Sequence, residues 1–310
     1  MTSIRTAFLF PGQGAQFAGM GRDFYDRFPE AQDVFDQAAA VLGPDFLEVI
    51  FSGPEEKLQQ TENTQPAVLT VSIAILRVLE KQGYKAIGLA GLSLGEYSAL
   101  VAAGTLSFKE TLLLVQKRGL YMQEAVPLGQ GMMVAIMGLS HDIVEQLCRD
   151  ARPEGFAAPA NYTCPGQIVI SGHVPAVKLA TDLARKAGAK KITKLKVSAP
   201  FHCALLQPVE TKLAGELDKI EVKKPSIPVV FNNTAKFSDC PDQIKVNLAR
   251  QVSSPILWEQ SVRALLAAGI NSFIGFGPGN SLTRLMKRIA PEIRAVSVET
   301  VEAVKQLSEE

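Results

Sequence analysis

Gly91-Leu92-Ser93-Leu94-Gly95 is the stretch around which the rest of the chain is organised. It follows an apolar run at 86–90 and precedes residues 96–103, whose spacing is typical of a helix. A strand, a sharp turn and a helix in this order are the setting of a nucleophile elbow, where flanking glycines permit a strained turn that exposes the serine hydroxyl. Ser93 is therefore the candidate nucleophile. The alternative is a tight turn in which Ser93 only caps the helix.

Apolar strands alternate with helices over most of the chain, which predicts an α/β fold. Pro66 is expected to open one of these helices, and the pair Ser107 and Glu110 forms a capping box at the start of another. The last helix is expected to end at Ile289 and to complete the fold. We expect strands at 7–10, 86–90, 227–232 and 272–276, and helices at 29–42, 66–81, 107–124, 203–219, 241–252 and 255–268.

Residues 131–197 follow a different order. Strands are expected at 132–138, 157–162, 167–171 and 191–197, with helices at 140–149 and 175–187. This is the βαββαβ order of ferredoxin-like units. We therefore expect 131–197 to form an inserted ferredoxin-like subdomain, and 1–130 with 198–310 to form a discontinuous catalytic core.

Composition indicates an ordinary globular chain of 310 residues. Because 32 basic residues nearly balance 31 acidic ones, we expect neither a nucleic-acid nor a membrane partner. The apolar run before Pro11 is too short for a signal peptide, which predicts a cytoplasmic protein. The four cysteines form no Cys-x-x-Cys pair and the three histidines are scattered, so we expect reduced thiols and no metal site.

A serine nucleophile needs a neighbouring base, usually a histidine. His141 follows a helix cap in a polar stretch, which is typical of a surface residue, and His173 lies in a turn after a strand. His202 follows Pro200 and Phe201 and opens an apolar helix, so its ring is expected at the end of an element near the core. Elimination leaves His202 as the candidate base.

No acid stands in a strand-end turn where a hydrolase triad would have one. A backbone carbonyl, or the amide side chain of Gln251 or Asn161, could hold the other histidine nitrogen instead. The oxyanion hole is expected from the backbone amides of Leu94 and Gln13. Arg118 has two interpretations, a solvated cation near a helix end or a clamp for a substrate carboxylate.

The chain resembles the malonyl-CoA:acyl carrier protein transacylases of fatty acid synthesis and their acyltransferase relatives in polyketide assembly. The resemblance covers nearly the whole chain. Six ordered blocks carry it: Phe10-Pro11-Gly12-Gln13-Gly14-Ala15-Gln16, Gly91 to Leu100, Arg118-Gly119 through Met122-Gln123-Glu124-Ala125-Val126-Pro127, Asn161 with Pro165-Gly166-Gln167, Phe201-His202, and Gly277-Pro278-Gly279.

The resemblance implies an α/β-hydrolase-like core with an inserted ferredoxin-like subdomain. It implies that Ser93 is acylated, that His202 is its base, and that the amides of Gln13 and Leu94 form the oxyanion hole. Arg118 matches the arginine that pairs with the malonyl carboxylate. Gln251 and Asn161 match a glutamine near the histidine and an asparagine near the site, and the family lacks an acidic triad member.

One position departs from the family pattern: Leu92 stands where a histidine usually precedes the nucleophile. The leucine predicts a more apolar pocket beside Ser93, and with it a change in which acyl groups the site selects. Phe201 resembles the malonyl-selecting version of its block.

The implied reaction is a ping-pong malonyl transfer from a coenzyme A thioester to acyl carrier protein, by a monomer that needs no metal or redox cofactor. A cationic surface should receive the carrier, and Lys190, Lys191, Lys194 and Lys196 are either that patch or a solvated strand face. A carrier-protein acyl hydrolase, a trans-acting polyketide acyltransferase of other selectivity, a general esterase and a non-catalytic carrier-binding protein are the alternatives.

Overall fold

The computed structural model describes residues 4–127, 129–195, 197 and 199–309. Lys196, in the candidate lysine patch, and Ser198, where the second part of the core is predicted to begin, lie outside the described residues.

A five-stranded parallel sheet forms the centre of the larger unit, with the strand order β7-β2-β1-β8-β9. Its strands other than the edge strand β9 are mostly buried and apolar, as expected where helices cover both faces. They are β1 (Thr6–Phe10), β2 (Gly88–Gly91), β7 (Val229–Val230), β8 (Ser272–Phe276) and β9 (Arg294–Val298).

Helices cover both faces of this sheet because alternate residues of each strand point to opposite sides. Phe8 and Phe10 of β1 join a large cluster with α2, α5, α6 and α7, whereas Ala7 and Leu9 pack with α12 and α13. The helices of the larger unit are α1 (Arg22–Tyr25), α2 (Pro29–Leu42), α3 (Asp45–Phe51), α4 (Glu55–Leu58), α5 (Thr61–Lys81), α6 (Gly95–Ala102), α7 (Phe108–Glu124), α10 (Gln207–Leu217), α11 (Pro241–Gln251), α12 (Trp258–Ala267), α13 (Ser281–Ile289) and α14 (Val301–Glu309).

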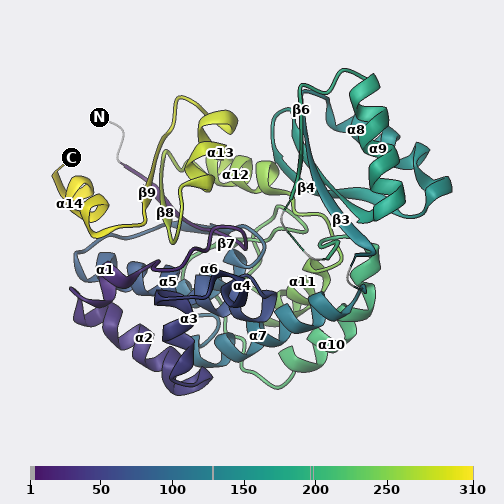
Figure 1. Ribbon diagram of the computed structural model, residues 1–310. Helices are drawn as coiled ribbons and strands as arrows, with labels where there is room; N and C mark the ends of the chain where they lie inside the picture. The colour runs from purple at the N-terminus through teal and green to yellow at the C-terminus, as the bar shows by residue number, and fades with distance from the viewer. Residues whose placement is uncertain (1–3, 128, 196, 198, 310) are drawn as a thin grey trace.

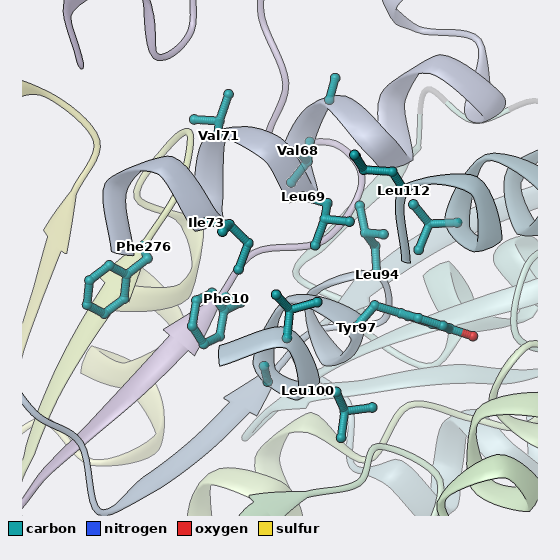
Figure 2. Close-up of a cluster of buried hydrophobic side chains, with 14 of the residues drawn as sticks. Phe10, Val68, Leu69, Val71, Ile73, Leu94, Tyr97, Leu100, Leu112 and Phe276 are labelled. Carbon is teal, nitrogen blue, oxygen red and sulfur yellow. The ribbon is translucent and has the colours of Figure 1, made fainter. Parts of the chain in front are cut away.

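The large cluster places the elbow helix against α5. Figure 2 shows Leu94 and Tyr97 gathered with Val68 and Leu69 of α5, next to Phe10 of β1. All five side chains are fully buried. The residues that follow the predicted nucleophile are therefore part of the main core.

A second, antiparallel sheet with the order β4-β5-β3-β6 forms the smaller unit. Its strands are β3 (Gly131–Met137), β4 (Ala157–Cys164), β5 (Gln167–His173) and β6 (Lys191–Lys194), and its helices are α8 (His141–Asp150) and α9 (Val174–Lys186). In Figure 1 this sheet and its helices, in teal, stand at the upper right of the larger unit. The order of elements and strands is ferredoxin-like, as predicted.

The two faces of the second sheet have different partners. Val134 and Ile170 pack with α8 and α9, whereas Met133 and Val169 join the large cluster of the core. Ile256 extends the edge of β4: its N–H donates to Ala160 O and its carbonyl accepts from Tyr162 N, both at 2.9 Å. The sheet is thus attached to the core by packing and by backbone hydrogen bonds. No helix among the described residues is long and apolar enough to cross a membrane.

Several predicted boundaries differ from the structure, four of them with consequences for the fold. Helix α5 begins at Thr61, so Pro66 lies inside it, on the covered side of the helix. The predicted strand 227–232 shrinks to two residues because Phe231 N turns away and donates to Lys236 O. The long helix expected from 203 starts as a 3-10 turn (Ala204–Leu206) before α10. The fold also continues past Ile289 with β9 and α14, which the sequence analysis did not predict. Both elements are short, so their apolar patterns extend over few residues.

Candidate active site

Ser93 lies in the sharp turn between β2 and α6, with a positive φ of 53°. Non-glycine residues rarely adopt this conformation, so the surroundings must hold it. The flanking glycines let the chain pack closely: a Cβ on Gly95 would lie 2.1 Å from Phe10 O, and one on Gly91 would lie 1.9 Å from the Gly95 backbone. The turn is therefore a strained elbow seated against the end of β1.

His202 lies beside this elbow, with its Nε2 at 2.7 Å from Ser93 Oγ. Its Nδ1 lies 3.0 Å from the backbone carbonyl of Gln251, at the end of α11. Because a carbonyl only accepts, Nδ1 carries the proton and Nε2 is left as the acceptor for the serine hydroxyl. Of the alternatives left open by the sequence, the backbone carbonyl orients the imidazole.

Burial and the nearby positive charge of Arg118 lower the pKa of His202 to about 3, against a smaller opposing effect of the Gln251 carbonyl. The imidazole is therefore neutral at neutral pH. A neutral imidazole can take the serine proton without a prior deprotonation step.

Arg118 of α7 is buried, with 1% of its surface exposed, which excludes the solvated-cation interpretation. Its Nη2 donates to Ser93 Oγ at 3.2 Å and to Gln251 Oε1 at 2.8 Å, and its Nη1 donates to Gln65 Oε1 at 2.7 Å. These partners are neutral oxygens, so the buried cation sits next to the nucleophile without a carboxylate on these nitrogens. Such an arrangement favours a ligand that brings its own negative charge.

Gln251 connects the groups around the elbow. Besides its contacts with His202 and Arg118, its Nε2 donates to the Ser93 carbonyl at 3.0 Å. Its side chain is fully buried. Gln251 therefore restrains the base, the cation and the nucleophile backbone together.

The loop after β1 brings Gln13 to the elbow. A Cβ on Gly12 would lie 2.4 Å from Leu92 O, so this loop packs directly on the turn. Leu94 is the N-cap residue directly before α6. Within the described part of the chain, the backbone N–H groups of Gln13 and Leu94 have no hydrogen-bond partner. Two free amides beside the nucleophile suit an oxyanion hole.

The remaining predicted residues lie farther from this cluster. Asn161 sits at an irregular point of β4, and its Oδ1 is buried without a partner among the described residues. No hydrogen bond of the described residues joins it to Ser93. His141 contacts the ring of Tyr162, and His173 accepts the Phe156 N–H, both within the smaller unit.

Three residues of the site did not stand out in the sequence: Gln65, Glu96 and Asn232. Asn232 follows β7, and a polar residue at the carboxyl end of a buried strand is a signal that could have identified it. Glu96 follows the elbow within α6 but has no exposed surface, which no local pattern indicates. Gln65 lies in the first turns of α5, directly before Pro66, where the sequence predicted the helix to begin.

A model of the acyl transferase domain matches residues 7–305 of this chain. The chain belongs to this acyl transferase family. It is 44% identical to the malonyl CoA-acyl carrier protein transacylase of Bacillus subtilis over 311 residues, covering 99% of this chain and 98% of that protein.

Solved structures agree with the acyl transferase fold. An acyl carrier protein S-malonyltransferase from Vibrio cholerae matches with a TM-score of 0.95 and 42% identity, over 98% of this chain and 99% of that one. A malonyl-transacylase in complex with a type II polyketide synthase acyl-carrier protein matches with a TM-score of 0.95 and 40% identity, over 99% of this chain and all of that one (100%). The predicted fold, a hydrolase-like core with a mostly parallel sheet and a ferredoxin-like subdomain, is confirmed.

Proposed function

We propose that this protein transfers a malonyl group from malonyl-CoA to the phosphopantetheine thiol of acyl carrier protein, through a malonyl-serine intermediate. The observation that carries the proposal is the position of Ser93 Oγ, within hydrogen-bond distance of both a neutral imidazole and a buried guanidinium. The imidazole activates the hydroxyl, and the guanidinium recognises an acyl group that carries a carboxylate. The named relatives support the same reaction.

In the first half-reaction, Ser93 Oγ attacks the thioester carbonyl while its proton moves to His202 Nε2. The tetrahedral oxyanion is stabilised by the backbone amides of Gln13 and Leu94. When the carbon–sulfur bond breaks, the proton on His202 passes to the departing sulfur and free CoA leaves. The malonyl group then forms an ester with Ser93.

In the second half-reaction, the carrier thiol attacks the malonyl ester and gives its proton to His202. The proton returns to Ser93 Oγ as the carbon–oxygen bond breaks. The acyl group moves between sulfur and oxygen with no change of oxidation state, so the proposed reaction uses no metal ion or redox cofactor. We propose that a monomer carries out both halves, since all the groups named lie in one chain.

Arg118 favours transfer of a malonyl group over the action of an esterase or an acyl hydrolase. A site for neutral esters gains nothing from a buried cation, which costs several kcal/mol to remove from water. The carboxylate of malonate would replace the neutral oxygens on Nη1 or Nη2 and compensate this charge. Asn161, whose buried Oδ1 has no partner in the described part of the chain, is proposed to face the same acyl group.

A cavity of about 620 Å³ opens beside Gln13, at the boundary of the two units, and is lined in part by Gln59, Lys194 and Val197. Lys190, Lys191 and Lys194 are exposed. We propose that this side receives an acidic carrier protein and the pantetheine arm. Lys190→Glu/Lys191→Glu should raise KM for the carrier while the rate of CoA release from malonyl-CoA stays unchanged.

Mass spectrometry after brief exposure to malonyl-CoA tests the proposal. We expect a malonyl adduct on the Ser93 peptide, no adduct in Ser93→Ala, and transfer of the adduct on addition of carrier protein. Rapid turnover to free malonate would indicate a hydrolase. Absence of both adduct and turnover would indicate a binding protein.

Arg118→Gln tests the carboxylate clamp, with Arg77→Gln, at a partly exposed arginine of α5, as a matched control. Loss of a charge-assisted bidentate contact should lower malonyl transfer about 100-fold and raise the ratio of acetyl to malonyl transfer. The clamp assignment is wrong if malonyl transfer survives and acetyl transfer does not improve.

A further inference from the structure

Asn232 makes four hydrogen bonds around the elbow and is fully buried. Its side-chain Oδ1 accepts the Ser93 N–H at 2.6 Å, and its Nδ2 donates to Gly91 O at 2.7 Å. Its backbone N–H donates to Glu96 Oε2 at 2.5 Å, and its backbone carbonyl accepts from Leu257 N at 2.8 Å. Every polar group of this residue therefore has a partner.

The two side-chain bonds reproduce a step of parallel sheet pairing. The β2–β7 register pairs Ala90 with Val230 and then stops, because the backbone of β7 turns away at Phe231 while β2 continues to Gly91. In a parallel ladder, the N–H of a residue donates to the carbonyl of the residue that precedes its partner, and its carbonyl accepts from the N–H of the residue that follows its partner. The carboxamide of Asn232 makes the same two bonds opposite Leu92: Nδ2 donates to the carbonyl of Gly91, and Oδ1 accepts the N–H of Ser93. A side chain thus continues the sheet where the backbone of β7 has turned away.

Glu96 holds the backbone of Asn232 in place from the other side. It is the second residue of α6, has no exposed surface, and receives the Asn232 N–H. Glu96 N itself donates to Ser93 O at 3.1 Å. The elbow is therefore held at three backbone groups. Asn232 bonds the Gly91 carbonyl and the Ser93 N–H, and Glu96 of α6 bonds both the Ser93 carbonyl and the backbone of Asn232.

We propose that Asn232, held by Glu96, is a positioning residue that fixes the strained backbone of Ser93 and so aims its hydroxyl at His202. The proposal rests on the proposed function of Ser93 as the nucleophile. Neither side chain touches substrate in this role. Burial raises the pKa of Glu96 to about 8, partly offset by the Asn232 N–H, so a neutral carboxyl serves as the acceptor at neutral pH. A glutamine at position 96 should therefore replace it.

The test compares the burst of CoA released when malonyl-CoA is mixed with the parent protein and four variants. Asn232→Ala should lower the acylation rate about 100-fold, the cost of a misplacement near 1 Å, while KM for malonyl-CoA changes less than about threefold. Glu96→Leu should act in the same direction. Glu96→Gln should retain the parent rate within about threefold. Ser98→Ala is the matched control, since Ser98 is buried on the same helix without a hydrogen-bond partner among the described residues.

Hydrogen exchange of the Ser93 amide gives a readout independent of the acyl group. Exchange should become faster in Asn232→Ala and stay unchanged in Ser98→Ala. If Asn232→Ala does not fold, Asn232→Asp decides by the burst rate, because it keeps the shape and the acceptor for Ser93 N–H but loses the donor to Gly91 O.

A folded variant at position 232 with the parent burst rate and unchanged Ser93 exchange would overturn the proposal, as would a Glu96→Gln protein as slow as Glu96→Leu. Failure of the proposed function looks different, because the parent protein itself would then show no burst with malonyl-CoA, whatever its Ser93 exchange.

Discussion

At the residue scale, the hydroxyl oxygen of Ser93 both donates to an imidazole and accepts from a guanidinium. Burial keeps the imidazole neutral, and the guanidinium adds to this effect because a second positive charge beside it is unfavourable. A malonyl carboxylate on Arg118 would remove that penalty and make His202 a stronger base. Recognition of the acyl group and activation of the nucleophile are thereby coupled through one oxygen.

The pH dependence of acylation follows from this arrangement. Since the pKa of His202 is lowered to about 3, the rate kcat/KM for CoA release should stay level from about pH 7.5 down to about pH 5. Arg118→Gln should move the acidic limb to higher pH, because it removes the charge that opposes protonation. Stopped-flow measurement of CoA release checks both. A parent profile that falls with a midpoint near the ordinary 6.5 would contradict the assignment.

Glu96 predicts a pH-dependent difference in stability between the parent and Glu96→Gln. Its folded-state pKa of about 8 lies above the ordinary 4.5, so the folded state binds more protons between these values and stability falls as pH rises through them. The whole effect is on the order of 5 kcal/mol. The unfolding free energy of Glu96→Gln relative to the parent should increase from about pH 4.5 to about pH 8.5. Urea unfolding at both pH values measures it, and a constant difference would refute a neutral Glu96.

At the element scale, the packing of α7 on α5 sets the depth of Arg118. Gly119 allows this approach: a Cβ there would lie 2.6 Å from Thr61 O on α5. The predicted helix cap at Ser107 is confirmed, with Glu110 N donating to Ser107 Oγ at 3.3 Å. The Glu110 carboxylate accepts from the Ser107 hydroxyl, whereas a full capping box would have it accept the Ser107 backbone N–H.

Gly119→Ala should therefore push α7 from α5, lower stability by about 1–3 kcal/mol and reduce malonyl transfer. Gly215→Ala is the matched control, because Gly215 is an exposed glycine of α10 with open space around it. It should stabilise the protein by about 0.5–1 kcal/mol and leave transfer unchanged. Thermal unfolding and transfer assays compare the two. Equal effects of both substitutions would show that the α5–α7 contact does not control Arg118.

At the scale of the whole molecule, one apolar cluster joins the two units. Met133, Ala135 and Val169 of the second sheet share it with Val68 and Leu69 of α5. The second sheet is also bonded to the core through Ile256. Separating the units would expose this shared surface and break these bonds.

We therefore expect a single cooperative unfolding transition, with equal calorimetric and van't Hoff enthalpies. Differential scanning calorimetry of the full chain, followed in parallel by tyrosine and tryptophan fluorescence, measures it. The single Trp258 reports on the larger unit, whereas the tyrosine signal combines four residues of that unit with Tyr162 of the smaller one. Two separated transitions would show that the units unfold independently.

Local patterns predicted much of the fold. The elbow, the alternation of strands with helices and the βαββαβ segment follow from periodicity and from glycine positions, which act over a few residues. Edges and ends were less predictable. Strand β9 has a weak apolar pattern, and Pro66 was expected at a helix start although α5 begins at Thr61. Neighbouring elements decide such boundaries, and a single segment carries little trace of them.

The sequence by itself determined which serine stands on the elbow, and by elimination which histidine could serve it. Only the tertiary structure decided that a backbone carbonyl orients His202, that Arg118 is buried against the nucleophile, and that Asn232 with Glu96 secures the turn. The physical reason is that every residue has a carbonyl and that burial depends on what packs over a side chain. Neither the choice of carbonyl nor the burial of a side chain can be read from residue type or spacing, because both depend on which distant segments pack together.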